Sequence, residues 1–487
     1  MRPGIRLSAP VSAAAAALVL VAALSGCAKV RGTLAPNRAP ETTLWVTGDL
    51  DTVAHTQRFF WDGQDVDGKV VGFAFRWLYQ PGAAPAGYDS NLWAFTDRHD
   101  LLLAVWSPNG VDFPVLQVRA IDDVPDGVVD ADTTDYGTAD PTPARQQFSF
   151  SNQPPTVQLT GTPPDTTLPV ASFKWAASDP DGILSLATYR VWLDGRPDRD
   201  TVVSGSGITL PGHFFQETSG LIEARRRTVY VSAIDDGGRA GLPDSFSWYV
   251  RPPAGTTLLV DEMPGNTFYD NFYRTELSTR LGAGNYSVLD LGTGTYFPTE
   301  DAVRETFLLF RHVFWCSENN PNLSAPLGLA DQPIRAFLSA GGNLYLGSPR
   351  LVGTGGALGD GFAREVLGAV DLRVNQLNST TGFVISPGQF AIGGQSPFDS
   401  LQSTGIYSGV EAFVLADPAE AMYLAPPGTL DTLHVDDWPV AVNRRYGSGQ
   451  GRFVYLAFPL RGMNSSFSGL PGRSATELRK IFDLFGM

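Results

Sequence analysis

The stretch VRAIDD at residues 118–123 returns as VSAIDD at residues 231–236, and this recurrence decides the fold of the first half of the chain. Other landmarks precede it in the same order, at offsets of about 113 to 115 residues, which indicates a tandem repeat. They are NRAP (37–40) and NQPP (152–155), FW (60–61) and FKW (173–175), DVDG (65–68) and DPDG (179–182), and WL at 77–78 and 192–193.

Each repeat consists of short alternating strands that are broken by Gly, Pro and Asp turns, such as the strand VYVSA at 229–233. This pattern is typical of a seven-stranded β-sandwich of about one hundred residues. We therefore expect two all-β immunoglobulin-like sandwiches, at residues 37–152 and 153–253. The repeats resemble the fibronectin type III and immunoglobulin-like modules of bacterial surface proteins, in which a buried strand tryptophan precedes an Asp-x-Asp-Gly turn. The resemblance implies spacer or binding modules.

Beyond residue 254 apolar strands alternate with helical stretches whose apolar residues recur at three and four spacing. Right-handed crossovers turn such an alternation into a doubly wound α/β domain, with a mainly parallel sheet and helices on both faces. The expected strands are 257–261, 286–291, 309–315, 343–346 and 452–458, the expected helices are 268–281, 300–307, 333–340, 362–367 and 474–485, and residues 370–440 are expected to be irregular.

The order of these elements in residues 254–487 resembles the class I glutamine amidotransferase-like fold, a flavodoxin-like sheet. The resemblance rests on FWC (314–316), AGGNLYLGS (340–348) and GRFVYLAFP (451–459). In active members, the strand after the Gly-Gly turn leads to a nucleophilic cysteine, and the last core strand ends in a His-Pro-Glu-like signature. Ser348 and Phe458-Pro459-Leu460 stand at those places here, so the resemblance implies a domain without the family's catalytic Cys and His.

Two candidate nucleophiles remain in this domain. Cys316 has His312 nearby in sequence, but four strand residues separate their backbones by about 13 Å, and a buried thiol is the competing interpretation. His434 with Asp436 behind it could orient an imidazole toward Ser348, by the logic of a catalytic triad, but we favour the interpretation that His434 is a surface-loop histidine.

In either case we expect the ligand crevice at the carboxyl ends of the parallel strands. The crevice residues are Glu262, Cys316, Ser317 and Ser348.

The first 26 residues look like a bacterial lipoprotein signal, with Arg2 and Arg6 before an apolar run that ends in the lipobox Leu24-Ser25-Gly26-Cys27. The run is shorter than the roughly 20 residues that span a bilayer, so cleavage is expected. Resemblance to lipobox proteins implies that Cys27 becomes a lipidated N-terminus, followed by a tether over residues 27–36. Ala28 resembles the residue found in lipoproteins sorted to an outer membrane. We expect an exported protein anchored to the cell envelope by this lipid.

Composition limits the partners. The formal net charge is −15, and removing Arg2 and Arg6 with the signal would lower it further, which argues against nucleic acid. The chain has two cysteines, so with Cys27 lipidated there is no disulfide framework. Its five histidines show no metal-ligand spacing, so zinc or iron is not expected.

Structural calcium is the one cofactor that the sequence leaves open. The acidic loop of the first repeat offers oxygen ligands at Asp122, Asp123, Asp126, Asp130 and Asp132, and a solvated acidic loop explains them equally well. For the repeated DxDG and DD acids we favour a turn-forming role, because Asp caps its own backbone in tight turns.

Five of the ten tryptophans fall in the first repeat, at 45, 61, 77, 93 and 106. Trp61 and Trp77 have counterparts in the second repeat, which predicts core positions. Trp93 and Trp106 are the candidates for an exposed platform that binds sugar or protein.

Two functions of different class follow. The first is a lipid-anchored binding or scaffolding protein for an envelope protein or glycan, with a catalytically silent head. The second is an envelope-anchored hydrolase of peptide, amide or glycan that uses Ser348 or Cys316.

Overall fold

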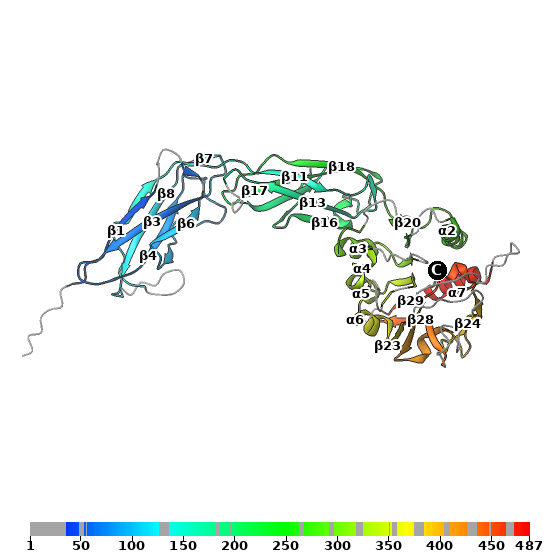
Figure 1. Cartoon of the computed structure of the whole chain (residues 1–487). Helices are drawn as coiled ribbons and strands as arrows, with labels where there is room; N and C mark the ends of the chain where they lie inside the picture. Colours follow the sequence, from blue (N-terminus) through cyan, green and yellow to red (C-terminus); the bar gives the residue numbers. More distant parts are fainter. Residues whose placement is uncertain are drawn as a thin grey trace, which may run out of the picture. The chain divides into compact units, whose positions relative to one another are not determined.

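A computed structural model gives the fold of the chain (Figure 1). It forms two compact units: residues up to Val105 together with Val111–Ser151, and Trp106–Gly110 together with Asn152–Met487. Within the described residues, no helix is long and apolar enough to cross a bilayer. The structure describes residues 36–47, 53–54, 56–125, 136–181, 186–194, 196–262, 267–291, 297–317, 325–349, 351–352, 358–374, 384–403, 410–425, 436–447, 450–463 and 472–487.

The first repeat is a β-sandwich of a three-stranded and a four-stranded sheet, β1-β3-β6 and β5-β4-β8-β9, with a small third sheet β2-β10-β7. Phe59 and Trp61 alternate along β3 and pack against Phe73 and Trp77 of β4, so the core lies between the two main sheets. The strands are β1 (Glu41–Val46), β2 (Val53–Ala54), β3 (Thr56–Gln64), β4 (Val70–Leu78), β5 (Ala94–Thr96), β6 (Asp100–Ala104), β7 (Val111–Asp112), β8 (Val115–Asp122), β9 (Ala144–Gln147) and β10 (Phe150–Ser151).

The second repeat has the same strand order, which confirms the two sandwiches. Its sheets are β11-β13-β16 and β15-β14-β17-β18, and the short strand β12 lies beside β18. Trp175 of β13 is buried like Trp61 of β3. The elements are β11 (Thr156–Gly161), β12 (Thr166–Thr167), β13 (Ala171–Ser178), β14 (Leu186–Leu193), β15 (Arg196–Val203), β16 (Gly207–Leu210), η2 (Gly212–Phe215), β17 (Arg225–Asp235) and β18 (Asp244–Val250).

The structure corrects the expected match between Trp77 and Trp192. Trp77 pairs with Leu116 and lies in the core, whereas Trp192 pairs with Tyr230 and stacks on its ring on the outer face of the sheet. Leu193 takes the core position instead. A slip of one residue along a strand exchanges its two faces, so the shared WL letters mark different positions.

Residues 254–487, here called the head, contain a nine-stranded sheet in the order β20-β19-β21-β22-β29-β28-β27-β24-β25 and a separate pair β23-β26. The strands are β19 (Thr257–Asp261), β20 (Ser287–Asp290), β21 (His312–Cys316), β22 (Asn343–Gly347), β23 (Ala369–Val374), β24 (Val384–Pro387), β25 (Leu401–Gln402), β26 (Glu411–Leu415), β27 (Ala421–Ala425), β28 (Trp438–Tyr446) and β29 (Gly451–Leu456). The helices are α2 (Thr267–Leu281), α3 (Glu300–Phe307), α4 (Ala325–Gly328), α5 (Asp331–Ser339), α6 (Asp360–Phe362), η4 (Ala363–Leu367), η5 (Pro418–Glu420), η6 (Leu460–Gly462) and α7 (Arg473–Phe485).

The expectation of a mainly parallel sheet holds for only half of it. The pairs from β20 through β29 are parallel, whereas β28, β27, β24 and β25 extend the sheet in antiparallel fashion. The added strands come largely from residues 370–440, which the sequence predicted to be irregular. Much of the C-terminal part is therefore β structure.

Helices cover both faces of the parallel half, which makes β19, β21 and β22 almost wholly buried. On one face Phe314 contacts Phe482 and Phe485 of α7. On the other face Trp315 contacts Phe307 of α3, and Phe307 contacts the α5 helix. The side chains of β21 therefore point alternately toward two different helical layers.

The second sandwich and the head share core and hydrogen bonds within one compact unit. Leu168 of the sandwich belongs to the apolar core of the head. Thr209 Oγ1 and Thr299 Oγ1 are 3.1 Å apart, and Arg251 donates a hydrogen bond of 2.6 Å to Val288 O. The space beside these contacts is enclosed by both modules.

Candidate functional site

The predicted crevice residues form a row just past the ends of the parallel strands. Glu262 N–H donates to Cys316 O, Ser317 N–H donates to Gly347 O, and Ser348 N–H donates to Leu456 O, at 2.8 to 3.1 Å. The structure thus brings Glu262, Ser317 and Ser348 together. All of them are buried, with Ser317 and Ser348 fully inaccessible.

Both oxygens of the Glu262 carboxylate accept hydrogen bonds from other side chains of the head. Oε1 accepts a hydrogen bond of 2.6 Å from Trp315 Nε1, and Oε2 accepts one of 2.6 Å from Ser317 Oγ. Trp315 lies on β21, the strand next to β19, and Ser317 directly follows that strand. A buried carboxylate needs such donors to offset its lost hydration, so this arrangement stabilises the strand ends.

A second carboxylate, Glu411, lies near Ser348 and was missed from the sequence. Its oxygens accept the N–H groups of Leu351 and Val352 at 3.0 to 3.2 Å. Tyr455 Oη lies 3.1 Å from Glu411 Oε2 and 2.8 Å from Ser348 O. Burial, and then the Glu411 charge, raise the pKa of Tyr455 well above its ordinary value, so the phenol stays protonated and donates. An acid at the start of an apolar strand was the one signal for this group.

Ser348 does not have the surroundings of a nucleophile. Its Oγ is fully buried and makes no hydrogen bond with any residue that the structure describes. Ser348 is level with Ser317 and faces the α3 and α5 layer, whereas His312 faces the α7 layer, where its ring stacks on Phe485. Ser348 and His312 therefore lie on opposite faces of the sheet.

His312 and Cys316 stand at the two ends of β21. Both are buried, and the His312 ring lies 3.1 Å from Asn343 Nδ2 through its Nδ1. Burial, with a smaller contribution from the Arg311 charge, lowers the pKa of His312 to about 4. His312 is thus a neutral core residue at physiological pH, at about 13 Å along the strand from Cys316.

Of the two remaining catalytic candidates, Asp436 and His434, the structure describes Asp436 alone. Asp436 is exposed and borders a surface cleft with Trp438 and Pro439, whereas Ser348 is buried and does not line that cleft. His434 lies outside the described residues, as do Cys27 and the whole signal segment.

Some of the calcium candidates also lie outside the described residues, and others lie within them. Asp126, Asp130 and Asp132 lie outside the described residues. Asp122 is buried, and its carboxylate accepts hydrogen bonds from Val124 N–H, Thr138 N–H and Asn37 Nδ2 at 2.7 to 3.1 Å. Among the described residues, no cluster of three or more acids, histidines or cysteines has the geometry of a metal site.

The repeated acids act mainly on their own backbone. Asp65 Oδ1 accepts from Asp67 N–H at 3.1 Å, and in the second sandwich Asp179 Oδ1 accepts from Asp181 N–H at 2.8 Å. Asp123 Oδ1 accepts from Lys69 N–H at 3.3 Å. The Asp65 and Asp179 contacts have the form of Asx turns, as the residue pattern predicts, whereas the Asp123 contact joins two separate loops.

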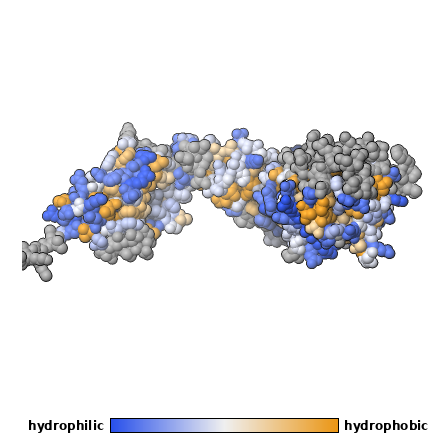
Figure 2. All heavy atoms as spheres, turned by 60° about the horizontal axis from the view of Figure 1, so that its bottom comes forward, coloured by the Kyte–Doolittle hydropathy of each residue, from blue (hydrophilic) through white to orange (hydrophobic). Residues whose placement is uncertain are grey.

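Trp93 and Trp106, the candidates for an exposed aromatic platform, are each half-buried. Trp93 lies between the guanidinium groups of Arg76 and Arg119, each about 4 Å from its ring centroid. Trp106 covers Gly238, where a β-carbon would come within 2.2 Å of the indole. Among the five tryptophans of the first repeat, Trp45 is the exposed one, at 44%, and it stacks on Phe60. Figure 2 shows apolar surface as separate patches among polar ones on the face in view.

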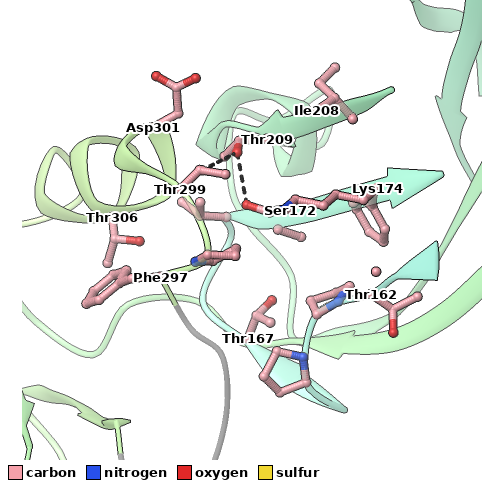
Figure 3. A pocket seen from close by; sticks show the side chains of 18 of the residues that line it. Thr162, Thr167, Ser172, Lys174, Ile208, Thr209, Phe297, Thr299, Asp301 and Thr306 are labelled. Atoms are coloured by element: carbon pink, nitrogen blue, oxygen red, sulfur yellow. Dashed lines mark hydrogen bonds between the residues drawn. The ribbon is translucent and has the colours of Figure 1, made fainter. Parts of the chain in front are cut away.

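A cavity of about 360 Å³ lies between the second sandwich and the head (Figure 3). One wall comes from β13, β16 and the loop after β11, and the other comes from Leu289, Phe297 and the start of α3. Ser172 Oγ, Thr209 Oγ1 and Thr299 Oγ1 form a chain of hydroxyls across it, with spacings of 2.9 and 3.1 Å. Sequence patterns do not reveal this site, because its two walls come from segments at least 80 residues apart.

Charge in this cavity is confined to its rim. Lys174 and Asp301 line it, and both side chains are exposed. Asp301 forms an ion pair of 2.8 Å with Arg304. The interior is therefore apolar surface interrupted by hydroxyl groups, which is the composition of a small-molecule or peptide site.

Comparisons with known proteins give fold likenesses alone. No protein-family model and no curated protein matches the chain. The chain is similar to the fibronectin(III)-like modules of Clostridium thermocellum CbhA at 15% identity, over 44% of this chain and 95% of that one, with a TM-score of 0.18. It is also similar to the PKD1 domain of Vibrio anguillarum Epp at 18% identity, over 21% of this chain and 100% of that one, with a TM-score of 0.15. The β-sandwich assignment rests on the strand order of the chain itself.

Proposed function

We propose that this chain is a lipid-anchored binding or scaffolding protein of the cell envelope, with a catalytically silent, class I glutamine amidotransferase-like head. Two sandwiches precede that head, and Cys27 would carry the lipid. The ligand or partner, an envelope protein or glycan component, would bind at the cavity between the second sandwich and the head.

One observation carries the proposal. The polar groups at the strand ends, where an active member would hold its nucleophile and base, are buried, and the carboxylates Glu262 and Glu411 among them accept hydrogen bonds from neighbouring side chains. Ser348 Oγ has no base among the described residues, and the two-layer packing separates it from His312. General-base activation of a nucleophile needs a hydrogen bond of about 2.6 to 3.2 Å, which these residues do not supply.

The alternative, an anchored hydrolase that uses Ser348 or Cys316, requires these buried side chains to reach substrate. The five parallel strands and their helices still favour an amidotransferase-like origin for the head. The antiparallel strands β28, β27, β24 and β25 widen the sheet beyond the expected pattern.

The anchor is tested on the full-length chain expressed in a bacterium that processes lipoproteins. Growth with an alkyne fatty acid should label the wild type and leave Cys27→Ala unlabelled, with the labelled form in the membrane fraction. Equal labelling of both, or a soluble wild type after export, would show that Cys27 is not the anchor.

Ligand binding is tested separately. Thr299→Trp fills the cavity from the head side, and Asp437→Asn changes an exposed residue elsewhere as the control. A ligand found on glycan or peptide arrays should lose binding with Thr299→Trp and keep it with Asp437→Asn. Retained binding in both variants would place the site elsewhere.

A further inference from the structure

The wall of the cavity contains a gap in the three-stranded sheet of the second sandwich. β11 ends at Gly161, opposite Lys174 of β13. The next residues, Thr162-Pro163-Pro164, cannot continue the ladder, because proline has no N–H to donate. From Ala171 to Phe173, β13 therefore has a strand neighbour on the β16 side alone.

The backbone of Ser172 points into this gap. Trp175 N–H donates to Ser206 O at 3.0 Å, toward β16. Successive residues of an antiparallel strand direct their N–H and C=O groups to alternate sides, so Phe173 and Ala171 also point toward β16. Ser172 points the other way, where β11 is no longer present. Within the described residues, its N–H and C=O have no hydrogen-bond partner.

The Ser172 hydroxyl, by contrast, is fixed. It lies 2.9 Å from Thr209 Oγ1, which in turn contacts Thr299 of the head (Figure 3). This chain of hydroxyls holds β13 and β16 in register beside the head. The open donor and acceptor of Ser172 are thus presented on a supported strand, a backbone arrangement suited to another extended chain.

We propose that the cavity binds a short extended peptide segment, which adds to β13 at Ser172 and packs its side chains on Pro163, Pro164 and the head wall. This rests on the proposed binding function and specifies its ligand class. Sugar rings usually stack on exposed aromatic faces, but the aromatic residues here, Phe173 and Phe297, are 1% and 3% exposed. The neutral interior also disfavours phosphate groups.

The test begins with a phage-displayed random heptapeptide library panned on the full-length chain. Selected peptides are synthesised and titrated against wild type, Ser172→Pro and Ser172→Ala. Ser172→Pro removes the N–H that faces the cavity and leaves the β13–β16 bonds, which come from Ala171 and Phe173. Ser172→Ala removes the hydroxyl and keeps the N–H.

We expect Ser172→Pro to weaken binding at least about tenfold, the loss typical of a backbone hydrogen bond, and Ser172→Ala to weaken it less than about threefold. If Ser172→Pro lowers the melting temperature, amide hydrogen exchange on the wild type replaces it. Ser172 N–H should exchange faster than Phe173 N–H in the free chain and become protected with peptide. No selected peptide, equal affinity for Ser172→Pro, or no protection at Ser172 would overturn the peptide assignment.

Two further experimental results distinguish failure of the peptide assignment from failure of the proposed function. Binding of an oligosaccharide that Thr299→Trp abolishes, without any peptide ligand, would overturn the peptide class and leave a binding protein. Mass spectrometry of the bound peptide after prolonged incubation should find it intact. A cleaved peptide would keep the ligand class and overturn the silent head.

Discussion

Trp315 Nε1 donates a hydrogen bond of 2.6 Å to Glu262 Oε1, and both residues are buried at the carboxyl ends of neighbouring parallel strands. This contact joins a carboxylate at the end of β19 to the indole of β21. In an open α/β sheet this edge is the usual place for a ligand. Here its polar groups bind one another.

Loss of the Glu262 carboxylate should therefore destabilise the head. Glu262→Ala leaves Trp315 Nε1 and Ser317 Oγ without their acceptor. We therefore expect the free energy of unfolding of the head to fall by about 2 to 3 kcal/mol. Urea denaturation followed by tryptophan fluorescence measures this. Asp437→Ala, at an exposed position, serves as the control and should change stability by less than about 0.5 kcal/mol. Equal effects would mean that the Glu262 contacts contribute nothing.

Substitutions of Glu411 and of Tyr455, which hydrogen-bonds to it, should lower the stability of the head by different amounts. Tyr455→Phe removes one donor and should destabilise the head by about 1 kcal/mol, the size of one hydrogen bond. Glu411→Leu leaves the buried N–H groups of Leu351 and Val352 without an acceptor and should cost at least twice as much. The same denaturation experiment ranks them. A larger loss with Tyr455→Phe would show that the phenol, and not the carboxylate, organises the cluster.

His312 predicts a specific pH dependence. Its pKa of about 4 lies below the ordinary value of 6.5 because the folded head buries the neutral ring. Unfolding lets the ring take up a proton, so its contribution to stability is complete above pH 6.5 and declines as the pH falls toward 4. The slope approaches about 1.4 kcal/mol per pH unit in that window.

The measurement is the difference in unfolding free energy between wild type and His312→Gln from pH 7.5 to 4.5. Taking the difference cancels the carboxylates common to both chains. Wild type should lose stability relative to the variant on acidification. A constant difference would mean that His312 titrates normally in the folded head.

The two buried strand tryptophans, Trp61 and Trp175, predict equivalent effects in separate sandwiches. Trp61→Ala and Trp175→Ala should each destabilise their own sandwich by about 3 to 5 kcal/mol through the cavity left behind. Trp45→Ala removes a 44% exposed ring and should cost far less. Calorimetry of the full chain reports each transition. A Trp45→Ala loss equal to that of Trp61→Ala would contradict the core assignment.

The sequence predicted the sandwiches well because their landmarks are periodic and repeated. Trp61 and Trp175 fall at equivalent core places, whereas the WL pair misleads, since identical letters one residue out of register face opposite sides. The antiparallel half of the head was missed because β24, β25 and β27 are only two to five residues long and are separated by long connections.

The candidate site was only partly predictable. Alignment of parallel strand ends places Glu262, Ser317 and Ser348 in one row, but the carboxylate that lies near Ser348, Glu411, comes from a distant segment. The cavity at Ser172 was beyond prediction, because a sheet gap and a helix start from different modules form it.

Chemical labelling of the native full-length chain tests the silent head most directly. A fluorophosphonate serine probe and iodoacetamide are applied in parallel, and intact-mass spectrometry counts the additions. Because Ser348 and Cys316 are both buried, and Ser348 Oγ makes no hydrogen bond with a described residue, we expect no modification of Ser348, and alkylation of Cys316 only after denaturation. Stoichiometric labelling of either residue in the native chain, abolished by His434→Ala, would contradict a silent head and establish the hydrolase.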